Sequence, residues 1–387
     1  MEKEIALITN YYPPETGAAA NRIALMARFF KDSGYAVQVI CPLPNYPTGV
    51  VFNDYTNSAG ITEEIDGIAV TRLAVSPTNS TRLWKRFKAM GSFSFSLWQY
   101  TRKHKLPELV FIQCSPLIVG AVGSFLARSK KHYTILNVSD LWPLAGKELG
   151  NLTDGFLYRR LEWLERYCYR KAELVLGQSQ EILGHIHTLF PDKNTFLYRN
   201  FPDFEPPKLP ETSSTRKIRL VYAGLLGVAQ GILTLCKQLE LPEQVELHLY
   251  GSGTETEAIQ EYIASSGKHI VYKGSLSRKR LHQELLDYDI SLVPLIKRIY
   301  GSVPSKIFEY AKLGLPMIYC GGGEGEQLIK THQLGWVVSP GDFEALNTLI
   351  SGLKQPFKDV EKVAVQKRAL LAFDARKQFK QLLDHLD

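Results

Sequence analysis

The feature that most constrains the fold is a regular alternation of short apolar runs with segments of helical length. Runs such as EIALITN, ELVFIQC and DISLVPL are rich in Ile, Leu and Val, and helical stretches such as residues 19–33 separate them. Near-continuous apolar strands are typical of parallel sheets that are buried on both faces. The alternation therefore predicts an α/β protein built from doubly wound parallel sheets.

The length of the chain favours two such sheets, because 387 residues are many for one hydrophobic core. Residues 202–217, PDFEPPKLPETSSTRK, are rich in Pro, Ser and charge without periodicity, which indicates a linker. We predict Rossmann-like domains over residues 1–201 and 218–365, and a C-terminal helix over 366–387 that packs back on the first domain. Ligands of such sheets bind at the carboxyl ends of the strands, so we expect those loops to face a cleft.

Several classes of protein are excluded or disfavoured. No run of 18 apolar residues is present, and the start MEKEIALITNYY lacks the pattern of a signal peptide. The five cysteines are dispersed and form no CxxC pair, which indicates reduced thiols in a cytoplasmic protein rather than a metal site. Serine-elbow, HExxH and GxxxxGK[ST] motifs are absent, which argues against α/β-hydrolases, zincins and P-loop NTPases.

The net charge of +7 is concentrated in one segment. Between Gly67 and Pro107 there are eight Lys or Arg residues and no Asp or Glu, so the rest of the chain carries a charge of −1. Trp84, Phe87, Gly91, Phe95 and Trp98 in this segment would share one stripe of a helix.

Two interpretations of this segment remain open. The stripe fits a helix that lies on an anionic membrane surface, where each cation contributes on the order of 1 kcal/mol. It fits equally well a stripe that packs on the core beneath a solvated basic face. Nucleic acid is disfavoured, because no recognition motif accompanies the charge. The residues assigned to a membrane or acceptor surface are Trp84, Lys85, Arg86, Lys88 and Trp98.

Two loops follow strands and contain small residues that let a ligand approach the backbone. In NYYPPETGAAANR, Gly17 and Ala18 precede a helix whose free N–H groups favour anions, although a tight turn explains the same residues. In YAGLLGVAQG, Gly224, Gly227 and Gln230 fit contact with a phosphate or sugar, or simply close packing. A third loop, YGSGTETEAI, lacks the last glycine of a dinucleotide fingerprint, and we interpret it as a structural turn.

The stretch GSVPSKIFEY (301–310) carries the most specific signal. Pro304 predicts the start of a helix, which puts Lys306 in the first turn, where a cation opposes the helix dipole by about 0.3–1 kcal/mol. A bound diphosphate reverses that sign, because charge-assisted hydrogen bonds contribute roughly 1.5–3 kcal/mol each. Glu309, three residues later, is placed to accept hydrogen bonds from a ribose diol. A surface Lys–Glu pair is the alternative.

One further acidic residue follows a strand. Asp140, in NVSDLWP, is expected at the edge of the cleft, where it can orient a sugar hydroxyl, serve as a base, or only cap a turn.

Together these loops resemble the family 4 glycosyltransferases, which have the two-domain GT-B fold and transfer sugars with retention of configuration. The resemblance covers essentially the whole chain. It is closest to a bacterial branch for capsule, O-antigen or colanic-acid-like polysaccharides, which includes fucosyl- and N-acetylfucosaminyltransferase-like members. The matching stretches are PPETGAAANR, SPLIVG, DLWP, AGLLGVAQG and SVPSKIFEYAKLGLP.

The resemblance implies a UDP- or GDP-sugar donor, a polyprenyl-diphosphate-linked acceptor, no metal or other cofactor, and a place on the inner face of the plasma membrane. It implies that Lys306 and Arg298 stabilise the leaving diphosphate and that Asp140 positions donor or acceptor. The remaining donor-binding residues would be Gly17, Ala18, Gly224, Gly227, Gln230, Ser302, Ser305 and Glu309.

Two departures from the family pattern bear on activity. Many members have two glutamates eight positions apart, and here the first position holds Gly301. Many also clasp the diphosphate with an Arg and a Lys, where this chain has Leu225 and Gln230. We expect Lys306, with Arg298 or Lys297, to supply the missing charge. A nucleotide-sugar 2-epimerase of the same architecture and a non-catalytic nucleotide-sugar or glycolipid-binding subunit are the alternatives.

Overall fold

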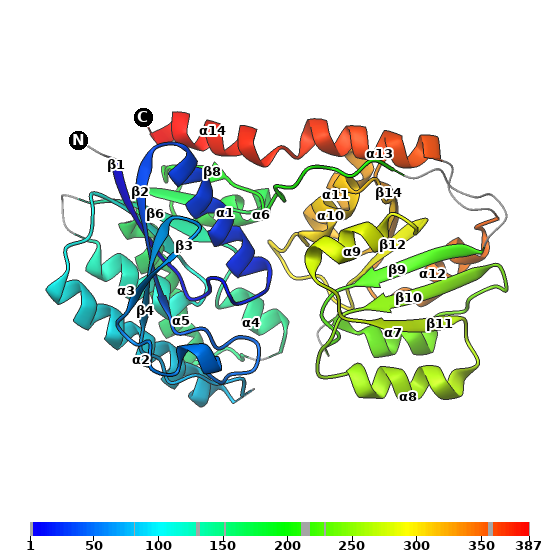
Figure 1. The fold of residues 1–387 in the computed structure, drawn as a ribbon, viewed down its shortest axis with the longest axis horizontal. Coiled ribbons are helices and arrows are strands. Elements are labelled where there is room, and N and C mark those ends of the chain that lie inside the picture. The colour runs from blue at the N-terminus through cyan, green and yellow to red at the C-terminus, as the bar shows by residue number, and fades with distance from the viewer. Residues whose placement is uncertain are drawn as a thin grey trace. The chain divides into compact units, whose positions relative to one another are not determined.

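The computed structural model describes residues 3–80, 82–128, 132–150, 152–209, 217–227, 230–354 and 359–386. The chain divides into two compact units, Met1–Arg199 with Arg376–Asp387, and Asn200–Ala375, which we call the N-terminal and C-terminal domains. Both are α/β domains with helices on the two faces of a largely parallel sheet (Figure 1). The predicted fold class is confirmed.

The N-terminal domain contains an eight-stranded sheet in the order β3-β4-β2-β1-β5-β6-β7-β8. Every pair is parallel except β3 with β4, which form an antiparallel hairpin at one edge. The strands are β1 (Lys3–Ile8), β2 (Tyr35–Pro42), β3 (Thr62–Ile65), β4 (Ile68–Leu73), β5 (Leu109–Gln113), β6 (Tyr133–Val138), β7 (Leu174–Gly177) and β8 (Thr195–Leu197).

The edge strand β3 was missed because its sequence, TEEI, is half-exposed and polar. The Asp66-Gly67 sequence of its turn was the available signal, because Asp-Gly is typical of two-residue hairpin turns. Both residues have the positive φ that such a turn requires, 53° and 71°. The prediction of an entirely parallel sheet was therefore wrong at this edge.

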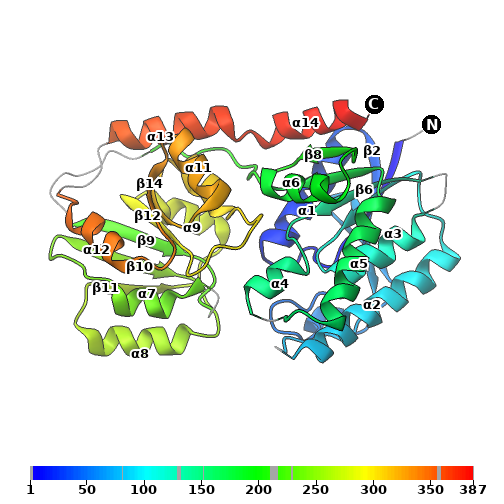
Figure 2. The ribbon, with the colours of Figure 1, turned by 180° about the vertical axis from the view of Figure 1, so that it is seen from behind.

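Helices cover both faces of the N-terminal sheet, and α2, α3 and α5 lie side by side on one of them (Figure 2). The helical elements are α1 (Ala18–Asp32), η1 (Asn53–Tyr55), α2 (Leu83–Lys103), α3 (Leu117–Leu126), α4 (Leu144–Glu148), α5 (Phe156–Lys171), α6 (Gln180–Leu189) and α14 (Ala375–Leu386). No helix in the described part of the chain is long and apolar enough to cross a membrane.

The C-terminal domain contains a six-stranded parallel sheet in the order β11-β10-β9-β12-β13-β14. Its strands are β9 (Ile218–Ala223), β10 (Val245–Tyr250), β11 (Ile270–Gly274), β12 (Ile290–Pro294), β13 (Met317–Cys320) and β14 (Gly335–Val338). Its helices are α7 (Ile232–Gln238), α8 (Thr256–Ser266), α9 (Arg278–Leu285), α10 (Lys306–Lys312), α11 (Gly323–Thr331), α12 (Phe343–Ser351) and α13 (Asp359–Ala372). Leu220, Leu247 and Leu292, from three neighbouring strands, are fully buried, which stabilises the fold by about 1.5–3 kcal/mol each.

The C-terminal tail is two helices, so the prediction of one helix over 366–387 was wrong. The chain leaves helical structure between α13 and α14, where the Phe373 ring packs against Phe308 with ring centroids 5.0 Å apart. Helix α13 contacts α10 in the C-terminal domain. Helix α14 belongs to the N-terminal domain, where Phe379 packs on Phe30 at 4.9 Å.

The expected linker is only partly described. Residues 200–209 belong to the C-terminal domain, and residues 210–216 lie outside the described residues, as do residues 228 and 229 of the YAGLLGVAQG loop.

Each sheet has one point where the strand order reverses, between β1 and β5 and between β9 and β12. Ligands of doubly wound sheets bind beside the carboxyl ends of the strands at such a point. The loops that follow these four strands are therefore where a site is expected in each domain.

Candidate active site

Lys306 lies at the reversal point of the C-terminal sheet, against the carboxyl end of β9. Its Nζ donates a hydrogen bond to the carbonyl oxygen of Ala223, and it lies 5.7 Å from the ring centroid of Tyr222 and 5.6 Å from that of Tyr310. Burial lowers the pKa of the Lys306 ammonium, and the negative charge of Glu309 partly offsets that effect. The cation is thus held close to the sheet by a carbonyl and two aromatic faces.

Helix α10 begins at Lys306 rather than at Pro304, so the predicted start was wrong by two residues. The carbonyl of Pro304 accepts a hydrogen bond from Ile307, which makes a tight turn ahead of the helix. Ser305 is the N-cap, but its side chain makes no capping hydrogen bond.

The glycine-rich loop after β9 meets Lys306. A Cβ at Gly224 would lie 2.8 Å from Lys306 Cε and Nζ and 2.9 Å from the Tyr222 hydroxyl, so a side chain there would displace the lysine. A Cβ at Gly227 would lie 3.0 Å from Gln230 Oε1, a buried atom without a hydrogen-bond partner in the described residues. Two stretches singled out in the sequence, 83 residues apart at Ala223 and Lys306, therefore form one cluster.

The glycines of the next loop have a packing role. A Cβ at Gly251, where φ is 131°, would lie 1.8 Å from the carbonyl oxygen of Gly224. A Cβ at Gly253 would lie 2.3 Å from the carbonyl oxygen of Leu226. This agrees with our interpretation of YGSGTETEAI as a structural turn.

Arg298, Gly301 and Ser302 lie in the segment that precedes α10. Arg298 is exposed, 5.9 Å from the Tyr300 ring centroid, and its Cδ would lie 3.6 Å from a Cβ at Gly322. Ser302 is half-buried, and its N–H donates to the carbonyl of Ile299. Gly301 has φ of 82°, so the glutamate common at this position in the family would be strained here.

Glu309 points its carboxylate at helix α9. Its Oε1 accepts hydrogen bonds from His282 Nε2 at 2.7 Å and from Arg278 Nε at 3.1 Å. Burial raises the pKa of Glu309, but the His282 hydrogen bond and the charges of Arg278 and Lys306 outweigh it and lower the pKa to about 2.

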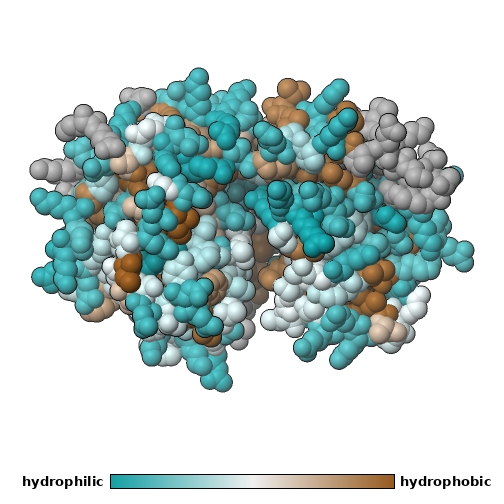
Figure 3. Space-filling model, in the orientation of Figure 1, coloured by the Kyte–Doolittle hydropathy of each residue, from teal (hydrophilic) through white to brown (hydrophobic). Residues whose placement is uncertain are grey.

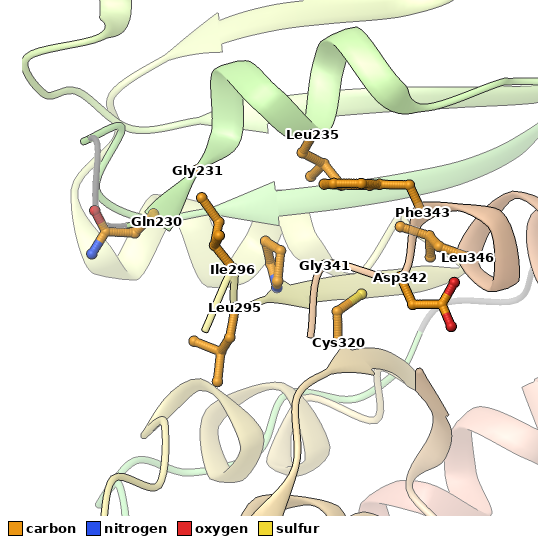
Figure 4. A pocket seen from close by; sticks show the side chains of 11 residues that line it. Gln230, Gly231, Leu235, Leu295, Ile296, Cys320, Gly341, Asp342, Phe343 and Leu346 are labelled. Carbon is orange, nitrogen blue, oxygen red and sulfur yellow. The ribbon is translucent and has the colours of Figure 1, made fainter. Parts of the chain in front are cut away.

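A small cavity lies beside the glycine-rich loop. It has a volume of about 10 Å³, room for about one water molecule, and is lined mostly by apolar side chains such as Leu235, Ile296 and Phe343 (Figure 4). Ile296 closes it against Gly231, where a Cβ would lie 1.9 Å from Ile296 Cδ1.

The N-terminal domain contains a larger cavity, of about 240 Å³, beside the reversal point of its sheet. Its volume is below the roughly 300–1,000 Å³ of sites for drug-sized ligands, so it suits a single small ring. Three of the stretches that carry the family resemblance contribute to its wall. They supply Ala19 and Arg22 from the first loop and helix, Ser115, Pro116, Leu117 and Ile118 from SPLIVG, and Asp140 and Trp142 from DLWP.

Asp140 and Arg22 both line this wall, and their charges attract each other. Asp140 is exposed, yet crowding by the protein raises the pKa of its carboxyl, and Arg22 partly opposes that shift. Arg22 is buried, and its guanidinium donates to Gln178 Oε1 at 3.0 Å and to the Ser139 hydroxyl.

Several buried polar atoms of the cavity wall have no hydrogen-bond partner in the described residues, namely Arg22 Nε, Gln113 Nε2 and Ser115 Oγ. Gln113 lies within 2.5 Å of the Thr9 hydroxyl, which also faces the Tyr11 carbonyl at 3.0 Å. In either orientation of the Gln113 amide, one of its polar atoms stays unpaired. Buried unpaired polar groups are rare and indicate a ligand or water.

The loop between β1 and α1 is held by a buried acid that the sequence did not reveal. Gly17, the N-cap of α1 with φ of 142°, and Ala18 are exposed at its end. Glu15 is buried and accepts hydrogen bonds from the N–H groups of Asn45 at 2.8 Å and Tyr46 at 2.9 Å. The loop is thereby fixed, with its small residues at the surface.

Helix α2 presents most of the predicted aromatic stripe to solvent. Phe93 and Leu97 face the core, whereas Trp84 is 80% exposed and Phe95 and Trp98 are exposed as well. For these aromatics the alternative of a core-facing stripe is therefore wrong. Arg86 and Phe87 instead line the cavity, and Lys85 and Lys88 are exposed.

The neighbouring helices extend this surface in a way the sequence analysis missed. Phe125 of α3 and Phe156 of α5 are exposed, with Arg128 and Arg160 at 4.3 Å and 4.9 Å from their ring centroids. Trp163 of α5 is also exposed. Figure 3 shows the molecule in the orientation of Figure 1. In that view the hydrophobic residues form small separate groups among polar ones.

Comparison with known families accounts for both domains. Residues 17–198 match the glycosyl transferase 4-like domain, and residues 217–355 match the glycosyl transferases group 1 domain. The chain is a glycosyltransferase of the GT-B fold. No curated protein sequence matches it.

Solved structures share the fold of this glycosyltransferase at low sequence identity. Sucrose-phosphate synthase from Thermosynechococcus elongatus superimposes with a TM-score of 0.75 at 17% identity, covering 99% of both chains. Anabaena HepE in complex with UDP and glucose gives 0.67 at 16% identity, again over 99% of both chains. WaaG, a glycosyltransferase involved in lipopolysaccharide biosynthesis, gives 0.66 at 13% identity over 98% of both.

Proposed function

We propose that this glycosyltransferase moves a hexose-type sugar from a UDP- or GDP-sugar, with retention, to a saccharide carried on a polyprenyl diphosphate. The product would belong to a surface polysaccharide such as a capsule or O-antigen. The observation that carries the proposal is the contact of Lys306 with the glycine-rich loop after β9. That contact brings a cation to the loop that contains Leu225 and Gln230, and the proposal is that Lys306 supplies from the other side the charge that an Arg and a Lys supply in many family members.

The proposed mechanism follows from the charge that develops in the reaction. Cleavage of the bond between the anomeric carbon and the phosphate leaves negative charge on the nucleoside diphosphate. Lys306 and Arg298 stabilise that charge as it forms, so no metal ion is required. Glu309 accepts hydrogen bonds from the ribose, and Ser302, Ser305 and the small residues at 17, 18, 224 and 227 allow close contact. The acceptor attacks from the face that the diphosphate leaves, and the diphosphate takes its proton.

UDP is the nucleotide that the related structures favour. HepE was solved with UDP and glucose, and the pneumococcal GtfA, with a TM-score of 0.64 at 13% identity, was solved with UDP and GlcNAc. GDP stays within the proposal, because the residues named here address the diphosphate and the ribose rather than the base.

The acceptor is proposed to use the cavity of the N-terminal domain. Its mixture of unpaired polar atoms with Phe87, Met90 and Trp142 suits one sugar ring, which has hydroxyl edges and apolar faces. Asp140 would orient the attacking hydroxyl. The exposed aromatics and basic residues of α2, α3 and α5 would hold the enzyme on the anionic inner face of the membrane, near a lipid-linked acceptor.

The test is incubation of the purified protein and membrane fractions with labelled UDP- and GDP-sugars. Nucleotide release that requires the lipid fraction, with label transferred to lipid, is the expected result. Interconversion of sugars without release would identify an epimerase instead. Binding without turnover of any donor would identify a non-catalytic subunit, and the proposal would fall.

A further inference from the structure

The carboxylate of Glu309 is held by one oxygen and open at the other. Arg278 and His282 both donate to Oε1, whereas Oε2 accepts no hydrogen bond from the described residues. A carboxylate offers about four acceptor positions, so the two donors use one oxygen and leave the other with its full capacity. The free oxygen has two lone pairs, so it can accept hydrogen bonds from both adjacent hydroxyls of a ribose diol.

The two donors come from one face of one helix. Arg278 and His282 are four residues apart on α9, the spacing at which side chains lie above one another. The His282 side chain is 13% exposed and that of Glu309 23%, so water competes little for their hydrogen bond. Arg278 is more open to solvent, with 49% of its side chain exposed.

His282 is itself held by the segment that enters the domain. The Phe204 ring lies against the imidazole, with centroids 4.5 Å apart and planes at 46°. Lys312 of α10 fixes that segment, because its Nζ donates to the Pro202 carbonyl at 3.2 Å and lies 5.0 Å from the Phe204 ring centroid. The imidazole is thus packed by a segment fastened to the helix that carries Glu309.

We propose that Arg278 and His282 are positioning residues that orient Glu309 so that Oε2 receives the ribose hydroxyls of the nucleotide, with Phe204 holding the imidazole in place. The inference rests on the proposed function, because it takes Glu309 as the ribose acceptor. It makes two residues of α9 responsible for the preference for ribonucleotides over 2′-deoxyribonucleotides.

The test measures that preference directly, by calorimetric titration of the full-length protein with UDP, GDP and their 2′-deoxy forms. The wild type should bind its ribonucleotide about tenfold more tightly than the deoxy form, the value of one charge-assisted hydrogen bond. In His282→Leu the preference should fall to less than about twofold. His282→Gln, whose amide N–H can replace Nε2–H, should keep most of it. Arg278→Gln should reduce it, and Arg280→Gln, which removes the same charge from an exposed position of α9, should not.

The outcomes separate this inference from the proposed function. Unchanged preference in His282→Leu, with unfolding at lower denaturant concentration, would show that the contact is only structural and overturn the inference. Absence of UDP and GDP binding by the wild type would overturn the proposed function and the inference with it. If His282→Leu does not fold, Phe204→Ala is the second variant, because it keeps both hydrogen bonds. It should reduce the ribonucleotide preference in part, and an unchanged preference would also contradict the inference.

Discussion

The two domains differ in how their candidate ligand groups are satisfied. In the N-terminal domain a cavity of about 240 Å³ leaves polar atoms of Arg22, Gln113 and Ser115 unpaired. In the C-terminal domain the ammonium of Lys306 is already bonded to a carbonyl and Glu309 to α9. A neutral sugar fits the first arrangement, because a neutral hydrogen bond gains the most free energy when its protein partner is otherwise buried and unpaired. A diphosphate fits the second, because its charge can compete with the carbonyl for Lys306.

The largest expected effect concerns Lys306. Lys306→Ala should lower kcat/KM by about 10²–10³-fold, the usual loss when one group that stabilises developing charge is removed. Lys330→Ala, which removes an exposed lysine of the same domain, is the control. The effect is measured as initial rates of sugar transfer, with the donor that the incubation with labelled UDP- and GDP-sugars identifies.

Equal rates for Lys306→Ala and the control would contradict the phosphate role. Retained nucleotide affinity with lost turnover would place the contribution of Lys306 in the transition state alone, which sharpens the contrast with the N-terminal cavity.

The Glu309 cluster should make the C-terminal domain sensitive to acid. The pKa of the Glu309 carboxyl is about 2, below the usual 4.5. The ionised carboxylate therefore stabilises the fold fully above pH 4.5, and this contribution disappears as the pH falls towards 2. Glu309→Gln should therefore lose on the order of 3 kcal/mol of unfolding free energy at pH 7. The difference from wild type should shrink in urea titrations at pH 3.5, and a constant difference would show that the low pKa is not its cause.

The basic surface should distinguish the domains in membrane binding. Lys85, Lys88 and Lys103 changed together to Ser should weaken flotation with anionic liposomes by about 100-fold, at roughly 1 kcal/mol per cation. Arg86 stays in place because it lines the cavity. The matched control removes three exposed cations of the C-terminal domain, Lys273, Lys279 and Arg280. Equal losses in both variants would mean that net charge, and not this surface, governs binding.

The comparison also shows which features were predictable. The apolar strands were predicted correctly because burial on both faces leaves a continuous apolar run in the sequence. Strand β3 was missed because it lies at an edge of the sheet. Lys306 was recognised as misplaced for a bare helix, but its contact with Ala223 is a product of the fold over 83 residues.

The partners of the candidate residues were the least predictable part. Nothing local marks His282 or Arg278, since a basic residue on a helix is usually solvated. Gln113 carried a weak signal, because a polar residue ending an apolar parallel strand faces the edge where ligands bind.

The smallest effect we predict comes from filling the N-terminal cavity. Leu161 of α5 is buried and lines it, so Leu161→Phe would add side-chain volume where the acceptor ring is proposed to sit. The KM for the acceptor should rise about tenfold, the lower end of what one methylene group changes in a hydrophobic pocket, while the Kd for the nucleotide stays unchanged. Leu183→Phe, at a buried leucine on α6 of the same domain outside the cavity lining, controls for overpacking. A rise in the nucleotide Kd with an unchanged acceptor KM would assign the cavity to the donor and reverse the division of roles between the domains.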